Sequence, residues 1–584
     1  MFIRKMKRAL SFFAIILVTA GAVNGQSVQE GKNHLFAQRY EQAGLAFGKV
    51  LEANPADVDA LYWAGQVILE REENPVSRLA KSKEWYNNAL QKTNNAPLIM
   101  VGAGEVDLLD NKANDARQKF ESALTLTRTK KGDNTDIVNA VARANTDVKQ
   151  GDPLYVIDKL NALAERGEKN AETYVWFGNA LRKARPGEAG GEAFRNYQKA
   201  LELNPSLALA SYRLARLFDS QRNWELVLQY LNECLAKDSK FTAAYYELFY
   251  YYFYRKDYST AETQLQKFIE SKQSGKDPQD DFLYAQLCWA RQDFDCAISK
   301  GAAVLATEGE SPKPRVIRLL ADASFQKADT LAKQNDAAGS AANYAKAKEY
   351  SDLFFAKKDA EDLILYDYQL RANILDKTGG SSEEIFNTYL QSTTVDTTLA
   401  LRIDLLKKGA EKFKAKGDSS SRNREGDLRL KVISMKETPG QRDYFDAGFA
   451  YFQGKNFERA DSIFDVYILK FPEEPYGYMM EYNIHRSIDS TMELGAAVPW
   501  GVKYLAILDK DPVKNKANII GVCSYLAQYY ANIAKDKDQA LSYLRKILEL
   551  DPNNQVIQQT ISMLENPQPA KPQPPARGNA PVRR

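Results

Sequence analysis

The stretch YYELFYYYFYRKDYSTA, residues 245–261, concentrates aromatic side chains that could bind a ligand. Seven tyrosines and two phenylalanines fall within its first fourteen residues. On a helix, Tyr246, Tyr250 and Tyr254 are four residues apart and would form one stripe. Tyrosine is common at binding hot spots because its ring stacks while its hydroxyl forms hydrogen bonds. Aromatic stripes at helical spacing also build protein cores, so a binding surface and a core both stay open at this point.

Residue types that support catalysis or metal binding are sparse. The two histidines are His34 and His485, and the four cysteines contain no C-x-x-C pair, so the sequence predicts no metal site and no cofactor. The chain has no nucleophile elbow and no phosphate-binding glycine loop. Acidic pairs such as Asp280 and Asp281 are typical of solvated helix surfaces. We therefore expect a protein without catalytic residues.

Cys288 and Cys296 lie near a predicted helix–turn–helix corner. In an oxidising compartment the two would be able to form a disulfide. The alternative is that both are buried as small apolar side chains, a common environment for free cysteine.

The first 25 residues have the pattern of a signal peptide. Four basic residues in MFIRKMKR precede the apolar run ALSFFAIILVTAGAV, and small residues lead up to Gly25. The run is about fifteen residues long, whereas a membrane-spanning helix needs about twenty. We expect cleavage near Gly25 and an exported protein, in the periplasm or associated with the outer membrane. An uncleaved anchor is the alternative.

The formal net charge of +3 comes from the ends of the chain. Four basic residues in the leader and four in the last eighteen residues account for eight positive charges, and without them residues 26–566 carry −5. A mildly acidic body is not typical of a protein that binds nucleic acid. The charge pattern therefore favours partners other than nucleic acid.

Helix endings recur along the chain. The segments VLEANPA, ALELNPS, CLAKDSK, ILKFPEE and ILELDPN end at or near Pro55, Pro205, Ser239, Pro472 and Pro552. From Pro205 to Ser239 is 34 residues, which is the period of a helix–turn–helix repeat. A helix pair of this kind cannot bury its apolar faces alone, so successive pairs must stack.

Small and bulky residues recur at fixed positions within these units. Small residues open the second helices, and bulky residues follow one turn later, as in Ala43 and Phe47, Ala116 and Phe120, Ala193 and Tyr197, Ala261 and Leu265, and Ala460 and Phe464. The first helices carry a small residue at Gly31, Gly65, Gly104, Gly178, Ala215 and Gly448. On these residues the chain resembles tetratricopeptide-repeat proteins over residues 26–310 and 441–565. The resemblance implies an all-α, right-handed superhelical solenoid of helix pairs.

The remaining segments fit this pattern less well. Residues 311–440 read as divergent helical repeats, with a separate helical insert as the alternative. Residues 566–584 are proline-rich and basic, and such a composition predicts a disordered tail that serves as a spacer or a docking segment.

In tetratricopeptide-repeat proteins the first helix of each pair lines a concave groove that binds partner segments. The resemblance therefore places the tyrosine stripe in that groove, with a widened core as the alternative. The predicted groove residues are Asn179, Arg182, Tyr212, Arg216, Tyr246, Tyr250, Tyr254, Phe282, Gln286 and Trp289. Phe249 and Phe268 occupy positions where the family prefers small residues, so we expect the helices there to stand farther apart.

Two functions follow from this interpretation. The first is a non-catalytic scaffold of the bacterial cell envelope that binds envelope proteins or extended peptides in the groove. The second is a glycan-binding protein, for instance an accessory to polysaccharide export, because aromatic faces stack on sugar rings while arginine and amide side chains bond hydroxyls.

Overall fold

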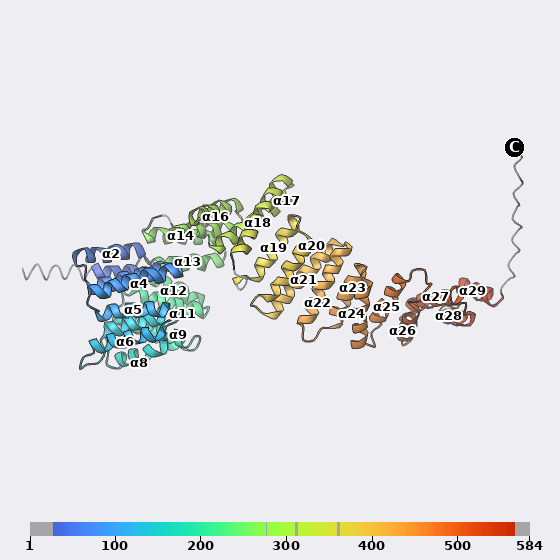
Figure 1. Ribbon diagram of the computed structural model, residues 1–584, viewed down its shortest axis with the longest axis horizontal. Helices are drawn as coiled ribbons and strands as arrows, with labels where there is room; N and C mark the ends of the chain where they lie inside the picture. The colour runs from blue at the N-terminus through green and yellow to red at the C-terminus, as the bar shows by residue number, and fades with distance from the viewer. Residues whose placement is uncertain (1–26, 276, 310–312, 359–361, 567–584) are drawn as a thin grey trace, which may run out of the picture. The chain divides into compact units, whose positions relative to one another are not determined.

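The structure is a computed structural model that describes residues 27–275, 277–309, 313–358 and 362–566 (Figure 1). Within these ranges the regular secondary structure is helical, apart from one isolated bridge between Thr129 and Gly132. The chain divides into two compact units, residues 1–319 and 320–584. The division falls inside the segment predicted to be divergent, whereas the predicted leader and nearly all of the predicted tail lie outside the described residues. None of the described helices is both long and apolar enough to cross a membrane.

The first unit is a succession of helix–turn–helix pairs. After a helix at residues 27–36, its helices are α2 (Tyr40–Ala53), α3 (Val58–Arg71), α4 (Pro75–Lys92), α5 (Pro97–Leu109), α6 (Ala113–Thr127), α7 (Thr135–Asp147), α8 (Pro153–Glu165), α9 (Ala171–Ala184), α10 (Gly190–Leu203), α11 (Ala208–Ser220), α12 (Trp224–Lys237), α13 (Thr242–Tyr254), α14 (Tyr258–Lys272), α15 (Pro278–Ala290) and α16 (Phe294–Glu308).

The second unit continues the helical pattern. The division between the units falls within α17 (Pro314–Lys333). The later elements are α18 (Ala337–Lys357), α19 (Leu365–Lys377), α20 (Ser382–Gln391), the 3-10 turn η2 (Ser392–Thr394), α21 (Leu399–Lys416), α22 (Ser419–Met435), α23 (Gln441–Gln453), α24 (Phe457–Lys470), α25 (Pro475–Ile488), α26 (Val498–Leu508), α27 (Lys516–Asn532), α28 (Lys537–Leu550) and α29 (Gln555–Glu565). With 20 and 21 residues, α17 and α18 are longer than the 13 to 15 residues of α13 to α16.

Local sequence signals set the ends of these helices. Each of the four repeated prolines predicted to end a helix lies two positions beyond the last residue of one, namely Pro55 after α2, Pro205 after α10, Pro472 after α24 and Pro552 after α28. Proline at this distance stops a helix because its ring cannot continue the hydrogen-bond ladder. At the start of α3 the side chain of Asp57 accepts a hydrogen bond of 3.0 Å from the Ala60 amide, which satisfies one of the unpaired donors of the first turn.

The helices of a pair approach closely where a glycine faces an aromatic ring. A Cβ atom placed on Gly178 of α9 would lie 2.4 Å from Cε1 of Tyr197 on α10, far inside van der Waals contact. The same relation holds in other pairs, between Gly31 and Phe47, Gly65 and Tyr86, Gly104 and Phe120, and Gly448 and Phe464. The glycines predicted from the repeat pattern are therefore the points where the two helices meet.

A pair of glycine substitutions should separate this packing role from helix propensity. We expect Gly178→Ala to lower the free energy of unfolding by about 1–3 kcal/mol, because its methyl group would overlap the Tyr197 ring. Gly44, in the interior of α2, has open space around its Cβ position, so Gly44→Ala should raise stability by about 0.5–1 kcal/mol. Urea denaturation of both variants measures the difference. A higher free energy of unfolding for both variants would show that the Tyr197 ring moves aside without an energetic cost.

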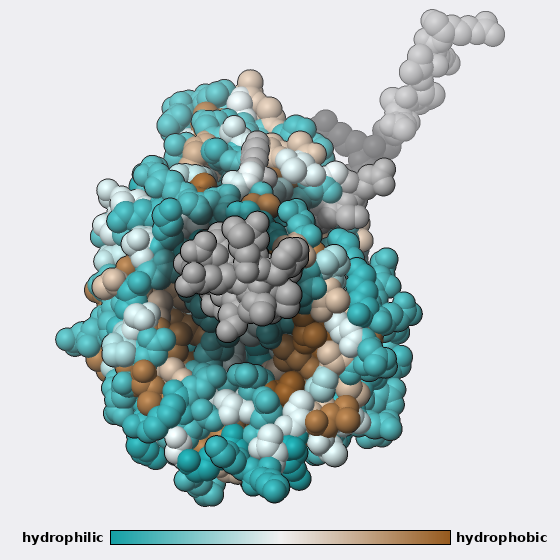
Figure 2. All heavy atoms as spheres, turned by 90° about the vertical axis from the view of Figure 1, so that its left-hand side faces the viewer, coloured by the Kyte–Doolittle hydropathy of each residue, from teal (hydrophilic) through white to brown (hydrophobic). Residues whose placement is uncertain are grey.

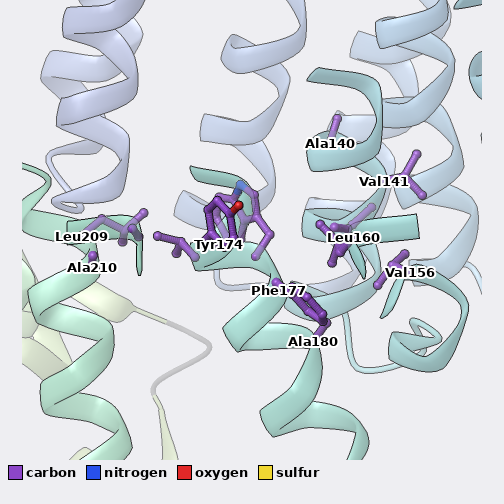
Figure 3. Close-up of a cluster of buried hydrophobic side chains, with 14 of the residues drawn as sticks. Ala140, Val141, Val156, Leu160, Tyr174, Phe177, Ala180, Leu209 and Ala210 are labelled. Atoms are coloured by element: carbon purple, nitrogen blue, oxygen red, sulfur yellow. The ribbon is translucent and has the colours of Figure 1, made fainter. Parts of the chain in front are cut away.

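One hydrophobic core runs through much of the first unit. It extends from Ala37 to Leu248 with buried residues from every helix from α3 to α13, whereas Ala43 and Phe47 of α2 belong to a separate cluster with Leu35 and Val67. Figure 3 shows how successive helices contribute to it, with Ala140 and Val141 from α7, Val156 and Leu160 from α8, Tyr174, Phe177 and Ala180 from α9, and Leu209 and Ala210 from α11. On the face in Figure 2 the periphery is mostly hydrophilic, with hydrophobic residues in smaller patches nearer the middle.

The first unit is also closed by contacts between residues far apart in sequence. Arg39, which precedes α2, donates from Nη1 to the Asp238 carboxylate at 3.0 Å and to the Lys240 carbonyl oxygen. The Ala243 amide donates to the Ala37 carbonyl oxygen at 3.4 Å. The beginning of the unit therefore lies against the turn between α12 and α13.

The closure encloses a buried guanidinium group. Arg143 of α7 is 2% exposed and pairs with Glu70 of α3 and, at 3.3 Å, with Asp147 one turn later on its own helix. Its guanidinium carbon lies 4.8 Å from the ring centre of Trp63 and 5.8 Å from that of Trp176. The planar guanidinium of Arg143 therefore lies among α3, α7 and α9, in contact with two tryptophan rings and two carboxylates.

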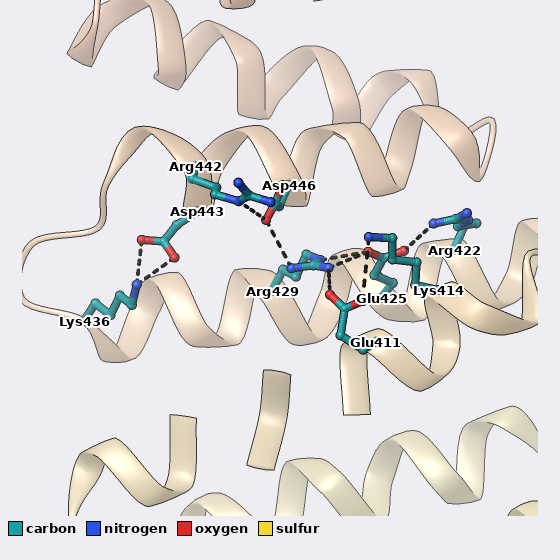
Figure 4. Close-up of polar contacts among 9 residues, drawn as sticks. All are labelled: Glu411, Lys414, Arg422, Glu425, Arg429, Lys436, Arg442, Asp443 and Asp446. Atoms are coloured by element: carbon teal, nitrogen blue, oxygen red, sulfur yellow. Dashed lines mark hydrogen bonds and ion pairs between the residues drawn. The ribbon is translucent and has the colours of Figure 1, made fainter. Parts of the chain in front are cut away.

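In the second unit a polar network ties three successive helices together (Figure 4). Arg429 of α22 contacts Glu411 of α21 at 2.6 Å, Glu425 of its own helix at 2.8 Å and Asp446 of α23 at 3.5 Å. Glu425 is almost fully buried and also pairs with Arg422 at 2.9 Å. Ion pairs of this kind fix which side chains of neighbouring helices face each other.

Candidate functional site

The tyrosine stretch forms α13, and its side chains divide between two environments. Leu248 and Phe249 are buried in the core, where Phe249 packs with Leu265 of α14 and Leu283 of α15. Tyr246 and Tyr250 are partly exposed, and Tyr254 at the end of the helix is 75% exposed. The helix therefore has a core face and a partly open tyrosine stripe.

This stripe borders the aromatic pocket, a cavity of about 930 Å³. Helix α13 forms one wall, α11 and the start of α12 form another, and α15 contributes one residue. The lining residues are Ala215, Arg216, Asp219, Trp224, Val227, Leu231, Tyr246, Glu247, Tyr250, Tyr251, Tyr254, Arg255 and Gln286. Its volume is in the range of pockets that hold small ligands or short peptide segments.

The tyrosine rings of the pocket pack against one another. The ring centres of Tyr246 and Tyr250 are 5.1 Å apart in an edge-to-face arrangement, and those of Tyr250 and Tyr254 are 5.8 Å apart and stacked. The Tyr250 hydroxyl donates a hydrogen bond of 3.1 Å to Oε1 of Gln286. Burial raises the pKa of this hydroxyl, so it stays a neutral donor. The stripe is thus a preformed surface rather than a set of independent side chains.

An ion pair lies beside the aromatic rings. Nη1 of Arg216 is 2.7 Å from Oε1 of Glu247, and the Tyr212 hydroxyl donates to the same oxygen at 3.3 Å. Burial raises the pKa of the Glu247 carboxyl, and the neighbouring Arg216 opposes that shift. The guanidinium and the carboxylate compensate each other, which leaves this part of the pocket polar without a large net charge.

Another part of the pocket lining combines a cation with two more rings. The guanidinium carbon of Arg255 lies 3.6 Å from the ring centre of Tyr251 and 5.4 Å from that of Trp224. Neither Trp224 nor Arg255 was predicted from the sequence. Each lies at a turn, and only the stacking of α12 beside α13 brings the two turns together.

Five of the ten predicted groove residues line this pocket: Arg216, Tyr246, Tyr250, Tyr254 and Gln286. The other five do not. Asn179 accepts a hydrogen bond from the Tyr197 hydroxyl at 2.8 Å, and Arg182 donates to the Arg216 carbonyl oxygen at 3.1 Å. Tyr212 is buried behind Glu247. Trp289 is 37% exposed but lies outside the pocket lining.

Phe282 departs most clearly from its predicted place on the groove surface. Its side chain is 5% exposed, and the Arg315 guanidinium lies 4.7 Å above its ring. Arg315, at the start of α17, covers a face of Phe282 that the repeat pattern leaves open. Phe282 is therefore a packing residue.

Cys288 and Cys296 form a disulfide that links α15 to α16. Their Cα atoms are 5.7 Å apart, a normal separation for this bond. The other two cysteines, Cys234 and Cys523, are buried free thiols. The bond fixes the helix pair that supplies Gln286 to the aromatic pocket.

Residues 28–97 match the family of tetratricopeptide repeats. The chain contains tetratricopeptide repeats. The stacked helix pairs, with a glycine of one helix against an aromatic ring of the next, are the structural form of that repeat. No curated protein sequence matches the chain.

Several solved structures resemble this repeat protein at low identity. The C-terminal part of a tetratricopeptide-repeat protein from Cytophaga hutchinsonii is 22% identical, with 48% of this chain and 98% of that one covered and a TM-score of 0.25. A tetratricopeptide-repeat protein from Parabacteroides merdae is 16% identical, with 47% and 98% covered and a TM-score of 0.35. YrrB, described as having an unusual peptide-binding site, is 23% identical, with 33% and 93% covered and a TM-score of 0.20.

Proposed function

We propose that this tetratricopeptide-repeat protein is a non-catalytic scaffold that binds an extended segment of a partner protein in the aromatic pocket. The observation that carries the proposal is the convergence of Tyr246, Tyr250, Tyr254, Arg216 and Gln286 on one cavity. Aromatic and arginine side chains in a partly desolvated pocket are the residues that contribute most to binding energy. The repeat fold itself is one that serves protein interaction.

The chemistry of the pocket favours a segment of mixed character. The tyrosine rings and Trp224 offer apolar faces for one or two bulky side chains. The charged lining consists of Arg216 and Arg255 with Asp219 and Glu247, so the two signs balance. A partner segment would therefore be selected by its aromatic or aliphatic side chains and its backbone hydrogen bonds, more than by its net charge.

The proposal places the protein in the bacterial cell envelope. The support is the leader-like N-terminal sequence, with its basic start and its apolar run before Gly25. A disulfide between Cys288 and Cys296 suits an oxidising compartment. Cell fractionation followed by mass spectrometry of the protein in each fraction would test this, and recovery of the full-length chain from the cytoplasmic fraction alone would contradict it.

A peptide selection tests the binding proposal. Residues 26–584 would be used to select ligands from a random peptide library, and affinity would be measured by fluorescence polarisation. We expect Tyr250→Ala and Trp224→Ala each to weaken binding by about 2 kcal/mol, roughly 30-fold, as hot-spot truncations do. Tyr476→Ala, an exposed tyrosine in the second unit, is the matched control. Equal affinity for all variants would place binding outside the pocket.

Glycan binding is the second candidate, because the pocket joins the rings of Trp224, Tyr251 and Tyr254 to the carboxylates of Asp219 and Glu247. Aromatic faces beside hydrogen-bonding carboxylates also suit sugar rings. A glycan panel read by the fluorescence of Trp224, with Tyr254→Ala as the test variant, distinguishes the two. A response to sugars that Tyr254→Ala abolishes, without any selected peptide, would favour the glycan.

A further inference from the structure

Three potential metal ligands meet where α24 packs against α25 in the second unit. Asp461 comes from α24, while Glu481 and His485 are four residues apart on α25 and share one face. A donor atom from each of the three lies within 4.8 Å of the other two. Helices α24 and α25 belong to successive repeats, so the cluster spans the junction between them.

Glu481 is unusual among the buried residues of this unit. Its side chain is 0% exposed, and neither of its carboxylate oxygens has a hydrogen-bond partner among the described residues. Oδ1 of Asp461 is also buried without a hydrogen bond. A buried ionised carboxylate that accepts no hydrogen bond costs several kcal/mol, and its ion-pair partner His485, at 3.6 Å, compensates it only when the imidazole is protonated. Such groups normally bind a cation or become neutral.

Two of the three distances between donor atoms are close to those around a small transition-metal ion. Nε2 of His485 is 3.0 Å from Oδ1 of Asp461 and 3.6 Å from Oε2 of Glu481. In a tetrahedral zinc site with bonds of about 2.0–2.1 Å, neighbouring ligand atoms are roughly 3.3–3.4 Å apart. The two observed separations lie on either side of that value, and one imidazole with two carboxylates is a ligand set that zinc accepts.

We propose that Asp461, Glu481 and His485 form a zinc site that joins successive repeats of the second unit. Asp461 and His485 are partly exposed, with side-chain values of 34% and 23%, so water can reach a fourth position. The ion would neutralise the Glu481 carboxylate and tie α24 to α25. The site is separate from the aromatic pocket and does not depend on the proposed function.

The surroundings of the cluster suit a cation. Asp465 adds negative potential at Glu481, and Lys503 of α26 opposes it. Trp500 of α26 stacks on the His485 ring with their centres 5.8 Å apart, which restricts the orientation of the imidazole. Without an ion, burial and the neighbouring Asp461 raise the pKa of Glu481 to about 10. The competing arrangement is therefore a protonated Glu481 that shares its proton with Asp461.

Metal titration of the mature chain tests the proposal. Chelator-treated protein would be titrated with ZnCl2 and followed by calorimetry, and bound zinc would be counted by inductively coupled plasma mass spectrometry after gel filtration. We expect one zinc per chain, a rise in the melting temperature of the second unit and a change in Trp500 fluorescence. Co2+ in place of Zn2+ should give the visible absorption of a low-coordinate site.

Variants assign the ligands. Asp461→Asn and Glu481→Gln should each weaken zinc binding by more than about 100-fold, beyond the range for outer-shell partners, whereas His34→Gln, which replaces the other histidine, should keep it. If Glu481→Gln does not fold, Asp461→Asn still tests the site, because Asp461 is partly exposed and its substitution should be tolerated. The proposal would be overturned if the protein bound no zinc, or if Asp461→Asn bound zinc as tightly as the unsubstituted chain. The cluster would then be a protonated Glu481 that shares its proton with Asp461.

Discussion

Replacement of Arg143 by methionine is expected to lower the free energy of unfolding of the first unit by about 3–5 kcal/mol. Methionine keeps much of the volume but removes the charge that compensates Glu70 and Asp147. It also removes a cation from above the rings of Trp63 and Trp176. Nearby Glu105 is affected as well, because burial already raises the pKa of its carboxyl to about 7 and Arg143 limits that rise.

Urea denaturation followed by tryptophan fluorescence measures this loss, since Trp63 and Trp176 report on the site. The double variant Arg143→Met/Glu70→Gln should recover part of the stability, because it removes one of the uncompensated carboxylates. Arg442→Met is the matched control, because Arg442 is 91% exposed and should change stability by less than about 0.5 kcal/mol. A loss below 1 kcal/mol for Arg143→Met would show that the buried cation is not required.

Phe464→Ala is expected to destabilise the second unit by about 3–5 kcal/mol. Phe464 of α24 is fully buried, and its ring fills the space that Gly448 leaves on α23. It also belongs to a core cluster with Tyr451, Tyr467 and Met480. Truncation would leave a cavity inside the α23–α24 pair, beside Met480 of the following repeat, and each pair depends on its neighbours for burial.

The control for this substitution lies on the same helix. Leu469 is 82% exposed, so Leu469→Ala should change stability by less than about 0.5 kcal/mol. Thermal unfolding by circular dichroism, with limited proteolysis to assign the transition to the second unit, separates the two variants. Similar melting temperatures for both would mean that α24 and α23 repack around the smaller side chain.

Contacts within a helix pair could be predicted from the sequence. The approach of Gly178 to Tyr197 and of Gly448 to Phe464 depends on residues a short distance apart, and a repeated spacing reveals them. The spacing of Tyr246, Tyr250 and Tyr254 likewise predicts that they share one side of a helix, and all three line the aromatic pocket. The periodicity of the sequence is therefore sufficient to predict a contact when the packing partner lies on the next helix.

Contacts that depend on stacking could not be predicted in the same way. Arg39 meets Asp238 across 199 residues, and no local pattern encodes that closure. Phe282 is covered by Arg315 from a later helix. Asp461 and His485 come within 3.0 Å of each other only because α24 packs against α25, and the spacing of the residues in the sequence does not indicate that contact. In each case the decisive neighbour comes from an element whose placement the spacing of residues does not specify.

The closure between Arg39 and the turn after α12 has a consequence for biosynthesis. A repeat array with purely local contacts can fold pair by pair as it leaves the ribosome. Here Arg39 can meet Asp238 only after that residue, 199 positions later, has been made, which takes roughly 10–40 seconds at about 5–20 residues per second. Until then the Arg39 guanidinium, which is 6% exposed in the folded protein, has neither the Asp238 carboxylate nor the Lys240 carbonyl oxygen to pair with, so the first unit closes only after α12 is complete.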